Sequence, residues 1–577
     1  MPPLTLGGID PTRAPLEKHC NLTGKDRKAA KSLKRPQVHI HIYIYIGPSV
    51  HLSSSRIINM KDVETGPEPV SDYVAPPEEV EKSEHPELYV NRPRDKFYDR
   101  GLKLFGYQFP AYSSSFVQLI MVSFVCFMCP GMFNALSGLG GNGLPPEYVS
   151  LADKGNVALY SVFAGVGFFS GTILNRLGAK WCLSLGGLGY AFYSSAYLCF
   201  NYTQNQGYVI AAGAILGLCA SMLWAGQGAI IMSYPTEESK GRYVAIFWII
   251  FNVGAVIGAI VPLAETAHTN EATSVSSGTY GAFLVLMFIG AVIALFMLPT
   301  DKVIKSDGTR VIVKEHPSWW SEIRALLKVL VKDPQIILLF PMFFTSNFFY
   351  TYQFNSFNAL RFNVRTRSLN SLLYWMAQIV GAYLWGWWVL DLKFWDRKRR
   401  ARVYHGIVFV LTMVIWGGGY AFEKTYTRES VADMELLDWS DSYYPGPVFM
   451  YIFYGMYDAI FQTYVYWLMG SLSNSARKVA LFAGFYKGLQ SAGAAVAWRI
   501  DSLGVPISAI FGTCWGLCAG SLLIGLPCVW FFVQEHTDVE VDLAFTEDKT
   551  LEEVSHHLEK NSTTVDRTQA TTEVPAN

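Results

Sequence analysis

Long apolar segments separated by short polar turns fill most of the chain between residues 113 and 532. A helix needs about 20 apolar residues to cross a hydrocarbon core of ~30 Å, and in lipid only helices or closed barrels satisfy every backbone group. The pattern predicts an all-α membrane protein with twelve transmembrane helices. They are expected near 113–135, 155–175, 181–200, 208–232, 243–264, 280–299, 335–357, 369–390, 404–422, 447–469, 479–499 and 507–532.

The spacing of these segments predicts two bundles of six helices. We expect a disordered cytosolic N-terminal region at 1–109, a first bundle at 110–299, a cytosolic linker at 300–334, a second bundle at 335–533 and a disordered tail at 534–577. Within the linker, one face of a helix would collect five apolar side chains, which predicts an amphipathic helix on the membrane surface. These side chains are Ile323, Leu326, Leu327, Leu330 and Val331.

The first 59 residues contain an alternating run of His, Ile and Tyr at 38–46. A CA/TA dinucleotide repeat read in frame encodes such a run, and the segment lacks the order of a signal peptide. We therefore expect translation to begin at Met60 and residues 1–59 to be a gene-model artefact. A peptide from this stretch in mass spectra of the native protein would refute the expectation.

Lys and Arg side chains are concentrated in alternate loops, which predicts that both termini lie in the cytosol. The exception is the loop 358–368, where Arg361, Arg365 and Arg367 would face the opposite side and are expected to have partners. Plasma membrane and vacuolar or endosomal membranes are all compatible with this orientation. The bilayer itself is the first expected partner.

Two ionisable residues lie deep in consecutive predicted helices, Asp458 in the tenth and Lys487 in the eleventh. An unpaired charge at such depth costs at least a few kcal/mol, so each is expected to face a partner, a cavity or a substrate. The helices are antiparallel neighbours. A structural ion pair, a gating or substrate-binding role and proton transfer by Asp458 are the open alternatives.

The turn between the second and third predicted helices has a recognisable pattern. It contains Gly171, Asn175, Arg176, Gly178 and Lys180. With the six-plus-six layout, it resembles the loop signature of the major facilitator superfamily. The resemblance implies a gating loop that locks the cytosolic face when the carrier is open outward. Asn175 replaces the more usual Asp, and at the equivalent place in the second half only Asp391 and a basic run remain.

Further segments resemble the Unc-ninety-three-like branch of that superfamily, in its fungal form, over roughly 97–535. They are Pro130–Leu136, Asn156–Ser161, Trp224–Gly228, Ser233–Pro235, Lys240–Arg242, Tyr350–Asn355 and Arg365–Asn370. The branch takes its name from an ion-channel regulatory protein, and another member escorts receptors between compartments. The resemblance thus supports the fold more strongly than it supports transport.

In the facilitator fold the first, fourth, seventh and tenth helices line a central cavity. The resemblance therefore implies a set of candidate cavity residues, with Lys487 of the eleventh helix beside them: Asn134, Gln227, Gln353, Asp458 and Gln462. Each polar side chain could instead bond a neighbouring helix. An aromatic stripe beside Asp458, from Tyr454 to Tyr464, could pack against a helix or contact a substrate such as a sugar, an amine or an aromatic metabolite.

The favoured function is transport of a small solute by alternating access. The alternative is a non-transporting protein that regulates or escorts a channel or another membrane protein. We expect no catalytic residues, no metal and no cofactor, since no embedded cluster of suitable side chains is present, and no nucleic-acid partner, since Lys and Arg together number 46, as do Asp and Glu. Cys126 and Cys129 form a CxxC pair that is interpreted as small buried core residues.

Overall fold

The structure, a computed structural model, describes residues 97–104, 107–139, 141–144, 148–267, 276–311 and 319–537. All of them belong to the compact unit Ala75–Asn577. The start predicted at Met60 and the disorder predicted for residues up to 96 and for the tail beyond 537 lie outside the described residues.

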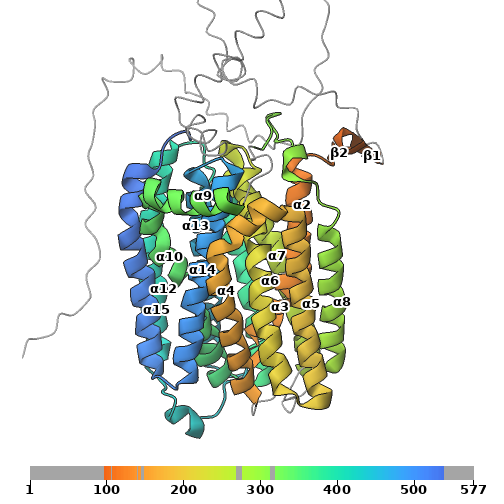
Figure 1. The fold of residues 1–577 in the computed structure, drawn as a ribbon. Helices are drawn as coiled ribbons and strands as arrows, with labels where there is room; N and C mark the ends of the chain where they lie inside the picture. The colour runs from red at the N-terminus through yellow and green to blue at the C-terminus, as the bar shows by residue number, and fades with distance from the viewer. Residues whose placement is uncertain are drawn as a thin grey trace, which may run out of the picture. The chain divides into compact units, whose positions relative to one another are not determined.

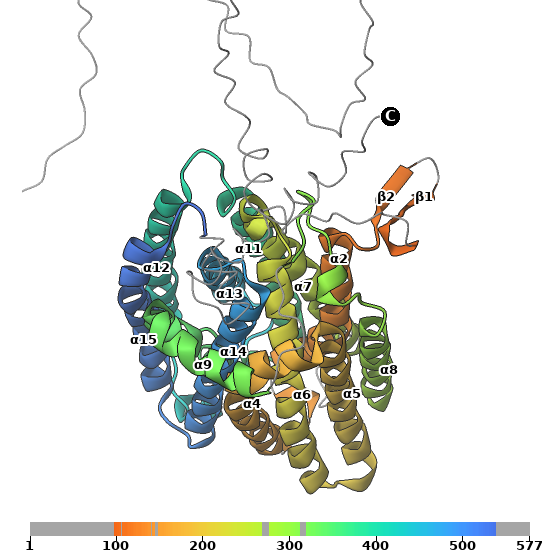
Figure 2. The same ribbon diagram turned by 45° about the horizontal axis from the view of Figure 1, so that its top comes forward.

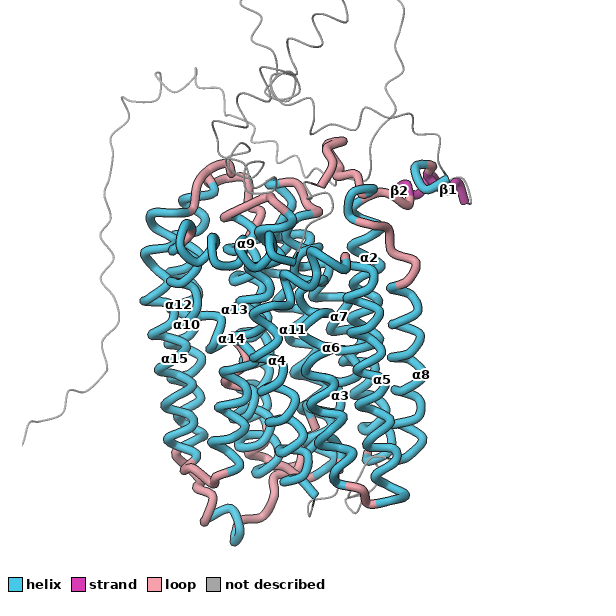
Figure 3. Tube along the Cα trace, viewed as in Figure 1, coloured by secondary structure: helices cyan, strands magenta, loops and turns pink. Residues whose placement is uncertain are grey.

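Twelve membrane-spanning segments run through this part of the chain, which confirms the predicted all-α fold. The first six are α2 (Ser115–Cys126) with η3 (Phe127–Gly131) and α3 (Met132–Gly138), α4 (Val149–Leu177), α5 (Ala179–Thr203), α6 (Gln206–Ser233), α7 (Lys240–Thr266) and α8 (Ser277–Ala294). Figures 1 and 3 show them as a bundle of long, roughly parallel helices.

The second six segments contain more interruptions. They are η8 (Pro334–Leu339) with α10 (Phe340–Thr345) and η9 (Tyr352–Ala359), α11 (Val364–Ala382) with η10 (Tyr383–Val389), α12 (Arg397–Glu423), α13 (Pro445–Ser471), α14 (Ala476–Ser502), and α15 (Ile507–Pro527) with η12 (Cys528–Phe532). On length and composition alone, seven helical segments in the described ranges can cross a membrane. α13 and α14, which carry the deep charges, are not among the seven.

Short elements lie outside the membrane-spanning segments. A 3-10 turn, η2 (Phe97–Asp99), precedes a two-stranded antiparallel hairpin of β1 (Gly101–Leu104) and β2 (Tyr107–Ala111), in which Lys103 pairs with Gln108. Further short turns are η4 (Gly141–Gly143), η6 (Glu237–Ser239), η7 (Thr300–Lys302) and η11 (Ser430–Asp433).

We call the end of the bundle that carries the turns 177–179, 234–240, 390–397 and 472–476 the linker face, and the opposite end the far face. The helix α9 (Trp319–Lys332) lies across the linker face (Figures 1 and 2). Ala325, Leu326 and Val329 are buried, whereas Leu327 and Val331 are exposed. The apolar stripe of α9 is therefore divided, because part of it packs on the protein and part remains uncovered.

The most extensive contacts between the halves are those of α4 with α14 and of α7 with α11. Glycines permit the close approach in the first pair. A Cβ on Gly167 would lie 2.5 Å from the Cα of Gly488, and a Cβ on Gly171 would lie 2.5 Å from the carbonyl oxygen of Ala480. The second pair is similar, because a Cβ on Gly386 would lie 3.2 Å from the carbonyl oxygen of Gly241.

Gly167→Ala should destabilise the folded protein by about 1–3 kcal/mol, because the added methyl group meets backbone atoms that have no free space. Gly165→Ala is the matched control on the same helix, since nothing lies within 4 Å of a Cβ there. The control should leave stability unchanged or raise it slightly, as alanine favours helix. Unfolding midpoints in detergent measure both variants, and equal effects would show that the close approach is not needed.

Candidate functional site

The tenth and eleventh spans place the deep charges on faces that also carry amides. α13 begins with Pro445 in its first turn, and α14 begins after Ser475, whose side chain accepts a hydrogen bond from the Lys478 N–H. Residues three or four apart share a face of a helix. Asp458 therefore shares a face with Gln462, and Lys487 with Gln490.

Asp458 is fully buried and its carboxylate accepts four hydrogen bonds. Its Oδ2 accepts from the hydroxyls of Tyr350 at 2.8 Å and Tyr374 at 3.2 Å, and from Nε2 of Gln378 at 2.6 Å. Its Oδ1 accepts from Nε2 of Gln462 at 2.7 Å. All four donors are neutral, so dipoles rather than a cation surround this carboxylate.

The Lys487 ammonium is enclosed by three aromatic rings, which we call the ring cage. Nζ lies 4.1 Å from the ring centre of Trp224, 4.8 Å from that of Tyr486 and 5.4 Å from that of Tyr466. It donates one hydrogen bond, to Oε1 of Gln490 at 2.7 Å. Trp224 belongs to α6 in the first half, and the other two rings belong to α13 and α14.

Among the described residues, Asp458 and Lys487 do not form a direct ion pair. Two amides bridge them instead. Gln462 donates to Asp458, and its Oε1 accepts from Nε2 of Gln490 at 2.9 Å. Gln490 in turn accepts from Lys487. The possible ion pair is therefore replaced by a chain of hydrogen bonds, which we call the amide bridge.

The other predicted cavity residues fall in different positions. Gln227 of α6 is buried, and its Oε1 accepts from the Tyr466 hydroxyl at 3.0 Å across the interface between the halves. Gln353 is buried, and its Oε1 accepts from the Tyr374 hydroxyl at 2.8 Å, so it reaches Asp458 through that tyrosine. Asn134 on α3 is half-buried and takes no part in these contacts.

Sequence reasoning missed the tyrosines that contact Asp458 and the three rings of the cage. Gln378 and Gln490 are polar residues within apolar segments, which is a visible signal, but nothing marks one tyrosine among 32. The aromatic stripe faces elsewhere: the Tyr457 hydroxyl lies 2.9 Å from Thr412, and that of Tyr464 lies 3.1 Å from His405. It therefore packs against α12.

The predicted gating loop lies at the junction of α4 and α5 on the linker face. Asn175 donates to Oε2 of Glu322 at 2.8 Å and to the Arg477 carbonyl at 3.4 Å. Arg477 forms an ion pair with Glu322 at 2.8 Å, in which the side chains are only 2% and 0% exposed. The loop, α9 and the start of α14 thus meet in one buried contact, which we call the linker lock.

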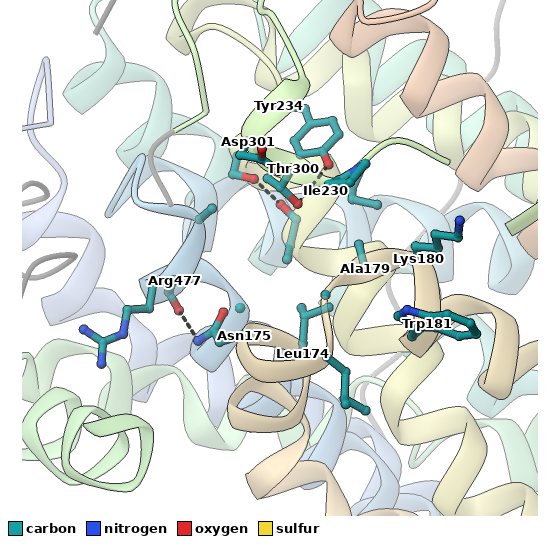
Figure 4. Close-up of a pocket in the computed structure, with 17 residues that line it drawn as sticks. Leu174, Asn175, Ala179, Lys180, Trp181, Ile230, Tyr234, Thr300, Asp301 and Arg477 are labelled. Atoms are coloured by element: carbon teal, nitrogen blue, oxygen red, sulfur yellow. Dashed lines mark hydrogen bonds between the residues drawn. The ribbon is translucent and has the colours of Figure 1, made fainter. Parts of the chain in front are cut away.

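The rest of the loop shapes the turn. Gly178 has a φ of 81°, a backbone conformation that favours glycine. The Lys180 ammonium lies 5.9 Å from the Trp181 ring centre, and Arg176 is exposed. A cavity of about 590 Å³ opens beside the lock, between α4, α5, α6 and α14, and Figure 4 shows the Asn175 amide turned toward Arg477 at its edge.

The corresponding place in the second half also makes a contact between the halves. The Asp391 carboxylate accepts from the backbone N–H groups of Gly241 at 2.8 Å and Arg242 at 2.7 Å, at the start of α7. A carboxylate is favourable at a helix N-terminus. Burial raises the pKa of Asp391 to about 6, although these two N–H groups oppose the shift.

The first residues of the tail also lie on the linker face. Glu237 forms an ion pair with Arg397 at 3.1 Å and accepts from the Thr537 hydroxyl at 2.6 Å. Glu535 accepts from the backbone N–H groups of Arg397 at 2.8 Å and Lys398 at 3.2 Å. Contacts from both halves and from the tail therefore meet on this face.

The three arginines of the loop 358–368, which are exceptions to the Lys and Arg distribution, have partners near the far face. Arg365 makes a bidentate contact with Asp438, at 2.6 and 2.7 Å. Arg367 donates to the Leu139 carbonyl, and Arg361 lies 5.4 Å from the Tyr426 ring centre. The hydrogen bond from Arg365 holds the pKa of the Asp438 carboxyl well below its usual range.

Asp438→Asn should cost about 2 kcal/mol at neutral pH, because it removes a charge-assisted hydrogen bond. A depressed carboxyl pKa gives stability that is fully present above the unfolded value of about 3.9 and is lost as pH falls below it. The difference in unfolding midpoint between wild type and variant should therefore be constant from pH 7 to about pH 5 and narrow below about pH 4. A pH-independent difference would contradict the assignment.

No group of three or more His, Cys, Asp or Glu side chains in the described ranges is arranged to hold a metal ion. Cys126 and Cys129 are buried free thiols.

The arrangement of the helices in two six-helix bundles is the major facilitator fold. Among solved structures, the human organic anion transporter MFSD10 (TETRAN) aligns with a TM-score of 0.50 at 13% identity, over 71% of this chain and 99% of that one. At this identity the likeness shows the fold alone. It agrees with two six-helix bundles.

Comparisons of sequence identify the family within this fold. Residues 148–515 match the family described as ion channel regulatory protein UNC-93. An UNC93-like protein of Schizosaccharomyces pombe is 54% identical over 422 residues, 73% of this chain and 83% of that protein. UNC93-like protein 1 of Arabidopsis thaliana is 40% identical over 431 residues, 74% of this chain and 92% of that protein. The chain belongs to the UNC-93 family, which confirms the resemblance inferred from its motifs.

Proposed function

We propose that this protein is a carrier that moves a small solute across a membrane by alternating access, with its binding site at the amide bridge and ring cage. The observation that carries the proposal is that Asp458 and Lys487 are both buried, with Lys487 against Trp224 of the first half, and do not pair directly. A purely structural pair would be in contact, because contact offsets the cost of burial best.

The interface between the halves supports the same function. The Trp224 ring from the first half contacts Lys487 from the second, and Trp248 of α7 donates to Oε1 of Gln378 at 2.9 Å. Any rocking of one half against the other would therefore change the surroundings of both charges. Carriers with pseudo-symmetric halves place their sites at such interfaces near the midplane.

The gating role belongs to the linker face. The loop between α4 and α5 would close this face together with Glu322 and Arg477. The loop residues are Gly171, Asn175, Arg176, Gly178 and Lys180. The contact of Asp391 with the start of α7 would close the other junction between the halves. We place the linker face in the cytosol, as the Lys and Arg distribution predicts. Opening would require these contacts to break.

A thermal-shift screen tests the proposal. The detergent-purified full chain and its Asp458→Asn variant are compared against sugars, amines, amino acids, nucleosides and organic anions. A ligand of the folded state raises stability by about 2.7 kcal/mol at a hundredfold excess over its dissociation constant. A hit that disappears in a folded Asp458→Asn variant supports the carrier, and a complete absence of hits contradicts it.

A second candidate function is regulation or escort of a channel or another membrane protein. The family description as an ion channel regulatory protein favours it, and so does the enclosure of the centre, where Asp458, Gln462 and Lys487 are at most 3% exposed. Co-purification of a defined membrane partner from native membranes, with no solute response, would favour this candidate.

A further inference from the structure

The central site has spare hydrogen-bond donors but no spare carboxylate acceptor. Asp458 already accepts four hydrogen bonds, at distances from 2.6 to 3.2 Å. The Lys487 ammonium has three N–H groups and makes one hydrogen bond to the protein, to Gln490. Its other N–H groups face aromatic rings, which attract a cation but accept hydrogen bonds weakly.

A second spare donor lies on the other side of the same interface. Nε2 of Gln227 is buried and has no hydrogen-bond partner, although its Oε1 accepts from Tyr466. A buried donor without a partner costs about 1–3 kcal/mol, so a ligand that accepts from it is favoured. Gln227 follows Trp224 by three residues on α6, so both lie on one helix face.

Tyr466 brings the two donors into one place. Its hydroxyl donates to Gln227, and its ring lies against the Lys487 ammonium. The halves also touch there, since a Cβ on Gly228 would lie 2.8 Å from Cβ of Ala483 and 3.4 Å from the Tyr466 ring. An ammonium from one half and an amide N–H from the other therefore flank one aromatic ring.

We propose that the ring cage takes the carboxylate of a small organic acid, with Lys487 and Gln227 as its hydrogen-bond donors. This inference rests on the carrier function proposed above and names the substrate class. A carboxylate offers several acceptor positions and a charge opposite to that of Lys487, and charge-assisted hydrogen bonds are about twice as strong as neutral ones. The faces of Trp224 and Tyr486 suit a flat apolar body attached to that group.

Cationic solutes fit this site poorly. An amine would meet the Lys487 ammonium, and the Asp458 carboxylate beyond the amide bridge already accepts from four donors. A neutral sugar would gain the spare donors but no charge. The site thus discriminates by charge, although an aromatic cage alone would suggest an amine.

The test compares acids with their own amides on the full chain. Benzoate, phenylacetate, indole-3-acetate and nicotinate are each paired with the matching primary amide, and benzylamine serves as the cation. At least one acid should raise the midpoint of thermal unfolding. The matching amide should bind at least about tenfold more weakly, which is a difference in binding free energy of about 1.4 kcal/mol. Stabilisation by amides or by benzylamine equal to that by acids would overturn the proposal, and so would a lack of response to every acid.

Two variants assign the response to the cage. Lys487→Met keeps the length of an unbranched apolar chain against the rings and should abolish the acid response. Gln227→Leu should weaken it by about tenfold, the loss of one hydrogen bond of about 1.4 kcal/mol. Lys393→Met removes an exposed lysine elsewhere and should change nothing. An acid response that survives in folded Lys487→Met would overturn the proposal.

These outcomes separate the substrate class from the carrier function. A neutral or cationic solute that binds in an Asp458-dependent way, without any response to acids, would refute the organic-acid assignment and leave the carrier standing. No response to any solute in either screen would refute both.

Discussion

Asp458→Ala should destabilise the folded protein more than any other single substitution in the transmembrane centre. The change removes the acceptor of the Tyr350 hydroxyl and of Gln378 Nε2, whereas Tyr374 keeps Gln353 and Gln462 keeps the Tyr350 oxygen as acceptors. Each buried donor without a partner costs about 1–3 kcal/mol, so the two donors left without an acceptor predict a loss of about 2–6 kcal/mol. Denaturation in detergent, followed by size-exclusion chromatography of the surviving folded fraction, measures it.

Asp458→Asn is the matched control, because it keeps the shape and one acceptor oxygen. It should cost much less stability than alanine, yet it removes the charge on which the proposed function depends. A variant that is folded and does not respond to solute would separate the two roles. If alanine and asparagine were equally mild, the four hydrogen bonds around this carboxylate would contribute little to stability, and the expected cost of the unpaired donors would be refuted.

Arg477→Leu should produce the second large effect. It breaks a buried ion pair and leaves the Glu322 carboxylate, 0% exposed, without its cation. Removal of one partner of a buried pair typically costs about 3–5 kcal/mol. Because Asn175 also donates to Glu322, the linker lock should loosen as a unit and the linker face should open more often.

An exposed pair on the same face supplies the control for this substitution. Lys393 and Glu238 lie 2.7 Å apart with side chains 74% and 76% exposed. Lys393→Leu should change stability by less than about 1 kcal/mol, as is usual for surface ion pairs. The rate at which a thiol reagent modifies a Ser473→Cys substitution, introduced into both variants, reports opening of the linker face. Equal accessibility in both variants would contradict a lock at Arg477.

The twelve spans and the depth of the two charges could be predicted from sequence, because hydropathy and helical rise are local properties. The way in which the charges interact could not. Asp458 and Lys487 lie on neighbouring helices, but the rotation of each helix about its axis depends on packing with the whole bundle. That rotation places Gln462 and Gln490 between the charges rather than beside them.

The burial of Glu322 could not be predicted from sequence either. In the isolated pattern of α9 it is one polar residue among several on the expected solvent side, and nothing there indicates burial. Only the packing of α9 across the linker face brings it to Arg477 and Asn175. The contact of Asp391 is hard to predict from sequence for a related reason, since its partners are backbone N–H groups of Gly241 and Arg242, which carry no side-chain signal.

The arginines of the loop 358–368 have partners that packing brings to them. Arg365 pairs with Asp438, which lies 73 residues away in a loop between α12 and α13. Sequence reasoning predicted that partners exist but could not select Asp438 among the acidic residues of that loop. Long-range contacts of this kind follow from the fold alone.

Alternating access is tested most directly by distances between spin labels on the two halves. Reactive native cysteines are first removed. Labels on Asp301→Cys and Arg399→Cys report the distance across the linker face. Labels on Gln204→Cys and Ser502→Cys report the distance across the far face. In proteoliposomes, Arg477→Leu should lengthen the linker-face distance and shorten the far-face distance together. Two distances that stay fixed, or that change independently, would contradict a carrier and favour a static regulator or escort.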